Sequence, residues 1–78
     1  MKSSYILYSS EGCHLCEDAL TLCIPLIDHK VLIIKDIVDD ETLVERYGVH
    51  IPVLMQVETK KELFWPFTSK DVITFLNS

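Results

Sequence analysis

The sequence has little of what marks disordered, nucleic-acid-binding or membrane-spanning chains. Its 78 residues include only two glycines and three prolines, against 49% hydrophobic residues, a composition that excludes disorder and low complexity. Lys and Arg number seven against twelve Asp and Glu, giving a net charge of −5, so we expect no nucleic-acid partner. No stretch approaches the roughly 20 apolar residues of a membrane span, so we expect no membrane partner.

Length and cysteine content limit the organisation of the chain. A chain this short forms one domain at most, and residues 1–78 are expected to be a single, monomeric domain. The start of the chain, MKSSYILYSS, has one lysine and only four apolar residues in a row, too little for a signal peptide, so we expect a cytoplasmic protein. Three cysteines leave one unpaired, which argues against a structural disulfide framework.

Hydrophobic periodicity predicts an α/β fold. Short aromatic and β-branched runs predict strands, and apolar residues at helical spacing predict helices. The order β-α-β-α-β-β-α predicts a four-stranded mixed sheet with helices on both faces. In chain order we expect a strand at 5–8, a largely buried helix at about 13–28, a strand at 31–34, a helix at about 40–47, strands at about 53–57 and 62–65 joined by a turn, and a last helix from 68.

Local signals add detail to these elements. Pro25 is expected to kink or end the first helix. Asp39 or Asp40 is expected to cap the second helix, and Gly48 to adopt the left-handed conformation after it. The strand VLII at 31–34 is the most hydrophobic, so we expect it at the centre of the sheet, covered on both faces. The last helix is expected to turn four residues inward: Val72, Ile73, Phe75 and Leu76.

The stretch SSEGCHLCEDAL, residues 9–20, places two cysteines three apart between a predicted strand and a predicted helix. At a helix start this spacing allows a disulfide, with α-carbons about 5–6 Å apart. Unpaired amides and the helix dipole stabilise an anion there, which lowers the pKa of Cys13 and makes it the attacking sulfur. Cys16, one turn further and less exposed, is then expected to resolve the mixed disulfide.

A zinc site is the main competing interpretation. Tetrahedral zinc needs four ligands, and the chain offers three cysteines and three histidines without a second CxxC or an HxxxH motif. Cys23 follows Cys16 by seven residues within an apolar stripe, so it is expected to be a small core residue. We therefore expect no metal.

Three motifs in order carry a family resemblance. CHLC opening a helix, RYGVHIPVL and then WPF near the end resemble the short glutaredoxin-like family of thioredoxin-fold proteins, over nearly the whole chain. The resemblance implies that Cys13 is the nucleophile, that Cys16 is the resolving thiol and that the Ile51–Pro52 peptide is cis beside them. Such a loop would offer the Ile51 backbone to an extended substrate by strand-like pairing.

The chain departs from ordinary glutaredoxins where those bind glutathione. They carry Pro-Tyr between the cysteines and a Gly-Gly-x-x-Asp segment before the last helix, where this chain has His14-Leu15 and WPFTSKD. Thr68, Ser69 and the amide end of the last helix can still hold a carboxylate. Because the diglycine is absent, we expect weak use of glutathione and no bound cofactor.

Two interpretations stay open for His14 and two for the whole chain. His14 can protonate and stabilise the adjacent thiolate, or it can be a solvated side chain on a turn. Trp65 and Phe67 are expected to fill the core. The function is either a thiol–disulfide oxidoreductase acting on protein or low-molecular-weight disulfides, or a thioredoxin-fold binding module with incidental cysteines. The candidate substrate-binding residues are His14, Ile51, Pro52 and Thr68.

Overall fold

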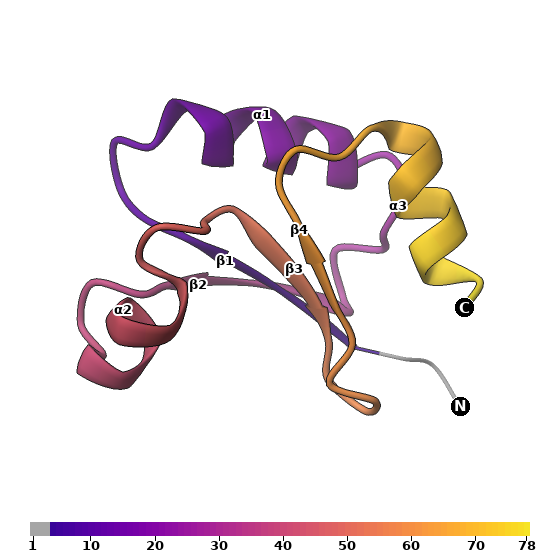
Figure 1. Cartoon of the computed structure of the whole chain (residues 1–78). Helices are drawn as coiled ribbons and strands as arrows, with labels where there is room; N and C mark the ends of the chain where they lie inside the picture. The colour runs from indigo at the N-terminus through magenta and orange to yellow at the C-terminus, as the bar shows by residue number, and fades with distance from the viewer. Residues whose placement is uncertain (1–3) are drawn as a thin grey trace.

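The computed structural model describes residues 4–78, which form four strands and three helices (Figure 1). The first three residues of the N-terminal stretch considered above lie outside the described part. The elements follow the predicted β-α-β-α-β-β-α order. They are β1 (Tyr5–Ser9), α1 (His14–Cys23), β2 (Leu32–Asp36), α2 (Glu41–Tyr47), β3 (Val53–Gln56), β4 (Glu62–Phe64) and α3 (Ser69–Leu76).

The strands form one mixed sheet in the order β2-β1-β3-β4. β1 is parallel to β2 and antiparallel to β3, and β4 is antiparallel to β3. α1 and α3 cover one face of the sheet and α2 lies on the other (Figure 1). The predicted four-stranded mixed sheet with helices on both faces is therefore confirmed. No helix within residues 4–78 is long and apolar enough to cross a membrane.

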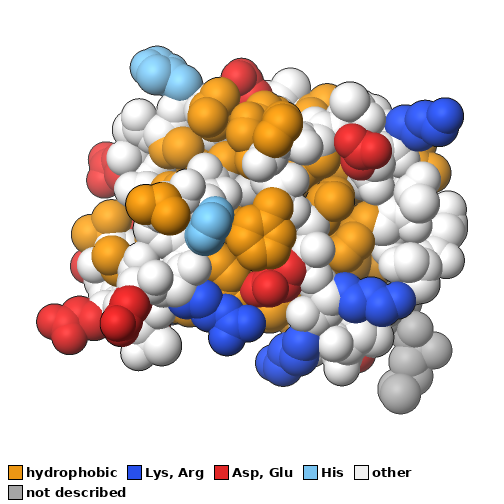
Figure 2. All heavy atoms as spheres, in the orientation of Figure 1, with side chains coloured by type: hydrophobic (Ala, Val, Ile, Leu, Met, Phe, Trp, Pro, Cys, Tyr) orange, Lys and Arg blue, Asp and Glu red, His pale blue; other side chains and the backbone are white. Residues whose placement is uncertain are grey.

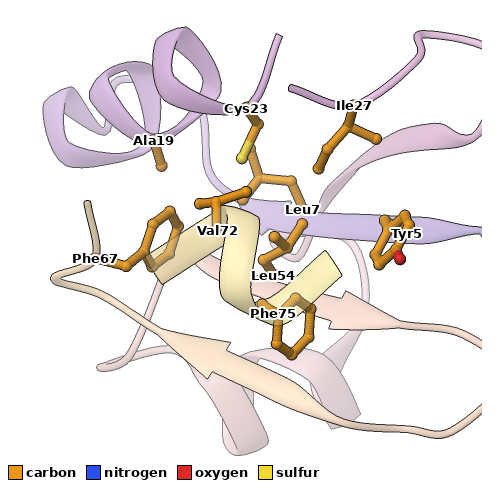
Figure 3. Close-up of a cluster of buried hydrophobic side chains, with 9 residues drawn as sticks. All are labelled: Tyr5, Leu7, Ala19, Cys23, Ile27, Leu54, Phe67, Val72 and Phe75. Carbon is orange, nitrogen blue, oxygen red and sulfur yellow. The ribbon is translucent and has the colours of Figure 1, made fainter. Parts of the chain in front are cut away.

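The larger hydrophobic core lies between the sheet and the α1–α3 layer (Figure 3). Leu7 and Leu54 come from the central strands, Ala19 and Cys23 from α1, and Val72 from α3, and none of them has exposed surface. Full burial of an aliphatic side chain contributes about 1.5–3 kcal/mol. This packing fixes α1 against β1 and so positions the residues at its amino end. The cluster also includes Tyr5, Ile27, Phe67 and Phe75.

A second core lies between the sheet and α2. Tyr8 of β1 stacks on Tyr47 of α2, with ring centroids 4.5 Å apart. The Tyr47 hydroxyl donates a hydrogen bond to the Glu62 carboxylate in β4, and Arg46 Nη2 lies 3.7 Å from the same carboxylate. Burial first, and then the hydrogen bond to Glu62, raise the pKa of Tyr47 to about 12. These contacts join α2 to both β1 and β4.

The most hydrophobic strand lies at an edge, so the prediction that it is central and covered on both faces is wrong. Among the described strands, β2 pairs with β1 alone, and Ile33 and Ile34 are 52% and 47% exposed. β3 joins the other side of β1, which makes β1 and β3 the central pair. The composition of β2 shows how apolar this strand is, but it does not show whether the later strand β3 pairs with β2 or with the other side of β1.

The starts and ends of the first two helices follow their predicted signals. α1 ends at Cys23, two residues before Pro25, which cannot donate the next helical hydrogen bond. α2 begins after Asp40, whose carboxylate accepts hydrogen bonds from the amides of Thr42 and Leu43. The aspartate cap satisfies amides that have no partner within the helix.

Two local predictions are wrong. Gly48 is not left-handed, because its φ of −51° is that of a right-handed helix. Glycine is needed there for space, since a β-carbon at this position would clash with the Val44 carbonyl oxygen. Ile73 is 46% exposed rather than buried, because Val72 and Phe75 define the buried face of α3 and Ile73 lies beside that face.

α3 begins with a capping box, which confirms the predicted helix start. The Thr68 hydroxyl accepts a hydrogen bond from the Asp71 amide at 3.2 Å, and the Asp71 carboxylate accepts one from the Thr68 amide at 2.9 Å. Each bond satisfies an amide that the helix itself leaves unpaired.

Replacing Thr68 with alanine should lower the free energy of unfolding by about 1 kcal/mol, because the hydroxyl acceptor of the cap is lost. Thr74→Ala is the matched control, since Thr74 is an exposed residue inside the same helix, where alanine is the better helix former. Urea denaturation of both variants gives the comparison. A loss for Thr68→Ala no larger than that for Thr74→Ala would contradict the capping role.

Candidate functional site

The two cysteines of the CxxC motif lie where β1 passes into α1. β1 ends at Ser9, and Gly12 makes the turn toward the helix with a φ of 79°, in the left-handed region that favours glycine. Cys13 is the N-cap of α1 in an extended conformation, and Cys16 lies in the first helical turn. The turn therefore delivers the first cysteine to the amino end of the helix.

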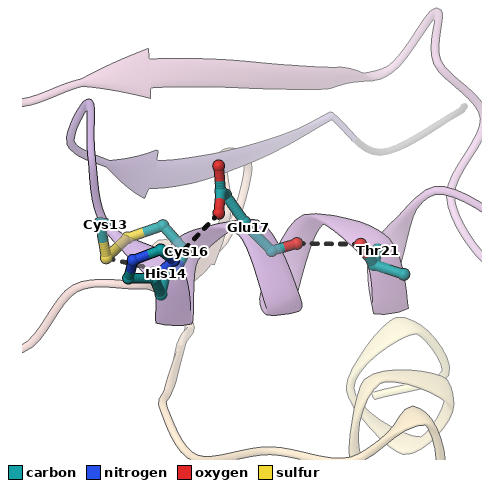
Figure 4. A network of polar contacts seen from close by, with 5 residues as sticks. All are labelled: Cys13, His14, Cys16, Glu17 and Thr21. Carbon is teal, nitrogen blue, oxygen red and sulfur yellow. Dashed lines mark hydrogen bonds and ion pairs between the residues drawn. A yellow bond between two sulfur atoms is a disulfide. The ribbon is translucent and has the colours of Figure 1, made fainter.

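The two sulfurs are joined in a disulfide, with α-carbons 5.2 Å apart (Figure 4). Cys16 is only 4% exposed, whereas Cys13 is half-buried. The Cys16 amide donates a hydrogen bond to Cys13 Sγ at 3.1 Å. An amide donor stabilises negative charge on a sulfur. Of the two sulfurs, Cys13 is therefore the one that both solvent and a helix amide reach.

His14 is placed in solvent beside the pair. Its Nδ1 lies 3.5 Å from Glu17 Oε2, and the two side chains are 95% and 74% exposed (Figure 4). The Glu17 main-chain carbonyl accepts a hydrogen bond from the Thr21 hydroxyl at 3.0 Å. The imidazole thus lies beside a carboxylate of its own helix, and its side chain is solvated in this structure.

The sheet register brings the Ile51–Pro52 segment to the same end as the cysteines. β3 begins at Val53, which lies opposite Tyr8 near the end of β1. Phe64, the last residue of β4, lies opposite Val53 in turn. The turn after β1, the segment before β3 and the segment after β4 therefore all leave the sheet at one end.

Backbone hydrogen bonds hold the Ile51–Pro52 segment in place. This peptide bond is cis, as is Trp65–Pro66. The Ile51 amide donates to the Tyr47 carbonyl at 3.0 Å, and the Pro52 carbonyl accepts from the Trp65 amide at 3.3 Å. The Ile51 amide is thus used inside the fold, which leaves the carbonyl as the Ile51 backbone group for a contact with another molecule.

The segment between β4 and α3 serves the core and the helix cap. Phe67 is 4% exposed and belongs to the larger core, which confirms the prediction for this residue. Trp65 is only partly buried and packs on Phe67 edge-to-face, with centroids 5.0 Å apart, at the border of that core. Thr68 is exposed, but its amide and hydroxyl are both bonded to Asp71. The Asp71 carboxylate already occupies the anion position at this helix end.

Cys23 is separate from the redox pair. It has no exposed surface, which confirms the prediction of a small core residue, and burial raises the pKa of its thiol to about 11. His29 is 90% exposed, and His50 packs edge-on against Phe64 at 5.3 Å. Within the described residues, no three or more His, Cys, Asp or Glu side chains are grouped so as to hold a metal ion.

Sequence reasoning missed a hollow of about 210 Å³ beside the disulfide. Leu7, Leu20 and Ile34 form its apolar lining, and Glu11 and Glu17 line it together with both cysteines. The hollow was missed because β2 was expected at the centre of the sheet, where Ile34 would be covered. The sequence does indicate the acidic character of this region, because Glu11 and Glu17 lie in a segment, residues 3–29, that contains no Lys or Arg.

Comparison with known proteins gives one family and several similar structures. The family described as "Glutaredoxin-like domain (DUF836)" matches residues 4–77. The X-ray structure of protein XcR50 from X. campestris is 29% identical, covers 95% of this chain and 96% of its own, and superposes with a TM-score of 0.85. The solution structure of protein Ne2328 from Nitrosomonas europaea is 28% identical, covers 96% and 92%, and has a TM-score of 0.75. No curated protein matches the sequence.

We expect the oxidised protein to hold the Cys13–Cys16 disulfide and a free Cys23. With a thiol pKa of about 11, only about one Cys23 in a thousand is a thiolate near pH 8, and burial keeps reagents away. Iodoacetamide should therefore modify Cys23 only in denaturant, as peptide mapping would detect. A Cys23→Ala variant is the control and should map to the same bridge. Recovery of Cys23 in the main intramolecular disulfide would contradict this assignment.

Proposed function

The chain belongs to the family of glutaredoxin-like domains, and on this premise we propose that it is a thiol–disulfide oxidoreductase. The observation that carries the proposal is the Cys13 sulfur, which accepts a helix amide and is bonded to the buried Cys16. Exchange requires an accessible thiolate with a second thiol close enough to displace the product. The CxxC pair supplies both groups.

The reaction begins with attack on a substrate disulfide. In the reduced protein, Cys13 acts as a thiolate, and its Sγ forms a bond to one substrate sulfur. The bond between the two substrate sulfurs breaks, and the other sulfur leaves as a thiolate that takes up a proton from solvent. The Cys16 amide, 3.1 Å from Cys13 Sγ in the disulfide form, stabilises the attacking charge.

Cys16 then resolves the mixed disulfide. Its thiol loses a proton, its sulfur attacks Cys13 Sγ, and the substrate leaves as its reduced thiol while the Cys13–Cys16 disulfide forms. The dithiol has passed an electron pair to the substrate. A thiol reductant, either a low-molecular-weight thiol or a dithiol protein, must return that pair before the next cycle.

We propose that residues at the same end of the sheet hold the substrate. The Ile51 carbonyl accepts a backbone amide from an extended substrate, and Pro52 has no amide hydrogen to crowd the sulfurs. His14, which is exposed in the first turn of α1, and Thr68, which is exposed at the start of α3, contact the substrate through their exposed side-chain surface, since the Thr68 amide and hydroxyl are bonded to Asp71. We place this reaction in the cytoplasm, where thiols such as Cys23 stay reduced, and assign it to a monomeric single domain that needs no metal.

Single cysteine variants test the roles of the two sulfurs. Replacing Cys16 with serine should leave the attack intact and trap a mixed disulfide on Cys13, because no thiol remains to resolve it. Replacing Cys13 with serine should abolish both reduction and trapping. Insulin reduction measures turnover, and mass spectrometry measures trapping. Alkylation rate against pH in each variant should show that Cys13 is the more acidic thiol, since it accepts the helix amide.

Two results would contradict these proposals, the first for the roles of the two cysteines and the second for the function itself. If Cys16 is the more acidic and faster-reacting thiol, the roles are assigned the wrong way round. If the wild-type protein reduces no disulfide and the Cys13→Ser variant binds its partners unchanged, the chain is a binding module instead.

Glutathione should bind weakly and support little activity with glutathione reductase alone. The Thr68 amide and hydroxyl are both used by Asp71, whose carboxylate also repels the carboxylates of glutathione. An NMR titration with reduced glutathione measures the affinity. Saturable, tight binding with shifts at Pro52 and Thr68 would show that the capping box does not close this end of α3 to glutathione.

A further inference from the structure

The hollow beside the cysteine pair lies on the side of β2. In the sheet, β2 and β3 flank β1 on opposite sides, and the Ile51–Pro52 segment leads into β3. The hollow is lined by Ile34 of β2, by the turn after β1 and by the first turns of α1. It therefore offers a second contact surface for a substrate bound to Cys13, across β1 from the Ile51–Pro52 segment.

The lining of the hollow is apolar and partly uncovered. Leu7 and Ile34 are paired in the parallel register, so both face the α1 side of the sheet, and Leu20 reaches the same space from α1. Leu7 is fully buried, but Ile34 is 47% exposed. At about 210 Å³, the hollow is smaller than the roughly 300–1,000 Å³ of sites that hold drug-sized ligands. Its size suits one aliphatic side chain.

Two acidic side chains lie beside this lining. Glu11 and Glu17 line the hollow, and Glu17 lies next to the disulfide on the side of α1 nearer β1 and β2 in Figure 4. Lys35 pairs with Tyr8 in register and so belongs to the α2 face. Figure 2 shows the other side of the molecule, with β4 in front, and on that face blue Lys and Arg side chains lie low and at the upper right.

We propose that this hollow is a specificity pocket that selects polypeptide disulfides in which an aliphatic side chain and a Lys or Arg lie beside the reacting cysteine. The aliphatic side chain fills the space between Leu7, Leu20 and Ile34. The basic group lies near Glu11 and Glu17 and is attracted by their charge. The inference rests on the proposed function, because the pocket acts only on a substrate that reacts with Cys13.

The pocket also separates polypeptide substrates from glutathione. Glutathione carries a net negative charge and has no aliphatic side chain beside its cysteine, so it cannot use either feature of the pocket. Burial of one aliphatic side chain removes apolar surface from water on both partners. Exposed charge pairs contribute less and are screened by salt. The aliphatic residue should therefore dominate the selectivity, with a smaller, salt-sensitive effect of the basic residue.

A set of matched peptides tests the pocket. Each peptide holds one cysteine as a mixed disulfide with thionitrobenzoate, flanked by Leu or Ser on one side and by Lys or Glu on the other. Release of thionitrobenzoate in a single turnover of the reduced protein gives the rate constant. Bis(2-hydroxyethyl) disulfide, which has no side chain to place in the pocket, reports exchange without selection. We expect Leu to exceed Ser by about tenfold and Lys to exceed Glu by about threefold at low salt.

Neighbouring residues supply a control for the apolar lining. Ile34→Ser should reduce the Leu-to-Ser rate ratio to near one, because it removes the exposed wall of the pocket. Ile33→Ser is the matched control, since Ile33 is the next residue of β2, is similarly exposed at 52% and lies on the opposite face of the sheet. That variant should keep the ratio of the wild-type protein. Because each ratio compares two peptides that react with the same variant, a change in the reactivity of Cys13 affects both rate constants equally and cancels.

Charge variants supply a control for the acidic residues. Combined Glu11→Gln and Glu17→Gln should remove the Lys-to-Glu preference, whereas combined Glu41→Gln and Glu45→Gln, which remove the same charge from α2, should keep it. Salt near 1 M should remove the preference in every variant that has it, because the Debye length falls to about 3 Å.

The outcomes distinguish this inference from the proposed function. If the wild-type protein reduces bis(2-hydroxyethyl) disulfide but treats all peptides alike, or if Ile33→Ser and Ile34→Ser behave alike, the pocket assignment is wrong and the oxidoreductase proposal stands. If it reduces neither the small disulfide nor any peptide, the proposed function fails and the pocket assignment fails with it. Faster reaction of the Glu peptides would overturn the charge argument alone.

Discussion

The hydrogen bond from the Cys16 amide to Cys13 Sγ joins the fold to the chemistry that we propose. Most helix caps use oxygen acceptors, and here the acceptor is the sulfur of Cys13, the more accessible of the two cysteines. As a thiolate, the same sulfur would accept a stronger, charge-assisted bond. The bond exists because Gly12 turns the chain at the end of β1 and because the buried face of α1 is fixed against the sheet. The start of α1, the sheet and the core together thus determine the position of Cys13 Sγ.

The sheet register determines what lies near that sulfur. Tyr8, Val53 and Phe64 are aligned across three strands, so three connecting segments leave the sheet at the same end. One carries the cysteines, one carries Ile51–Pro52 and one leads to α3. The core under α1 and the tyrosine stack under α2 hold this alignment from both faces. Strand pairing therefore brings segments that are far apart in the sequence to the same end of the sheet.

Much of this arrangement could be predicted from the sequence, and the errors share a physical cause. Element order, the stop before Pro25, the Asp40 cap and the Thr68 cap depend on local backbone chemistry, which neighbouring residues reveal. The position of β2 and the exposure of Ile73 depend on packing between distant segments, and local patterns do not contain that information. The cysteine pair was found because its chemistry is local. The hollow beside it was missed because it requires knowing that β2 is an edge strand.

An edge strand with exposed isoleucines carries a cost that the rest of the chain limits. Unpaired strand edges with apolar side chains favour aggregation, and charged residues on the edge oppose it. Here Lys35 and Asp36 end β2, and the acidic side chains beside the cysteines add like charge, which opposes association between copies. In the pocket that we propose, the same acidic groups would repel anionic thiols, and the apolar lining at Ile34 would accept a basic polypeptide. On this proposal, the exposed apolar edge is tolerated because the charges beside it make it selective.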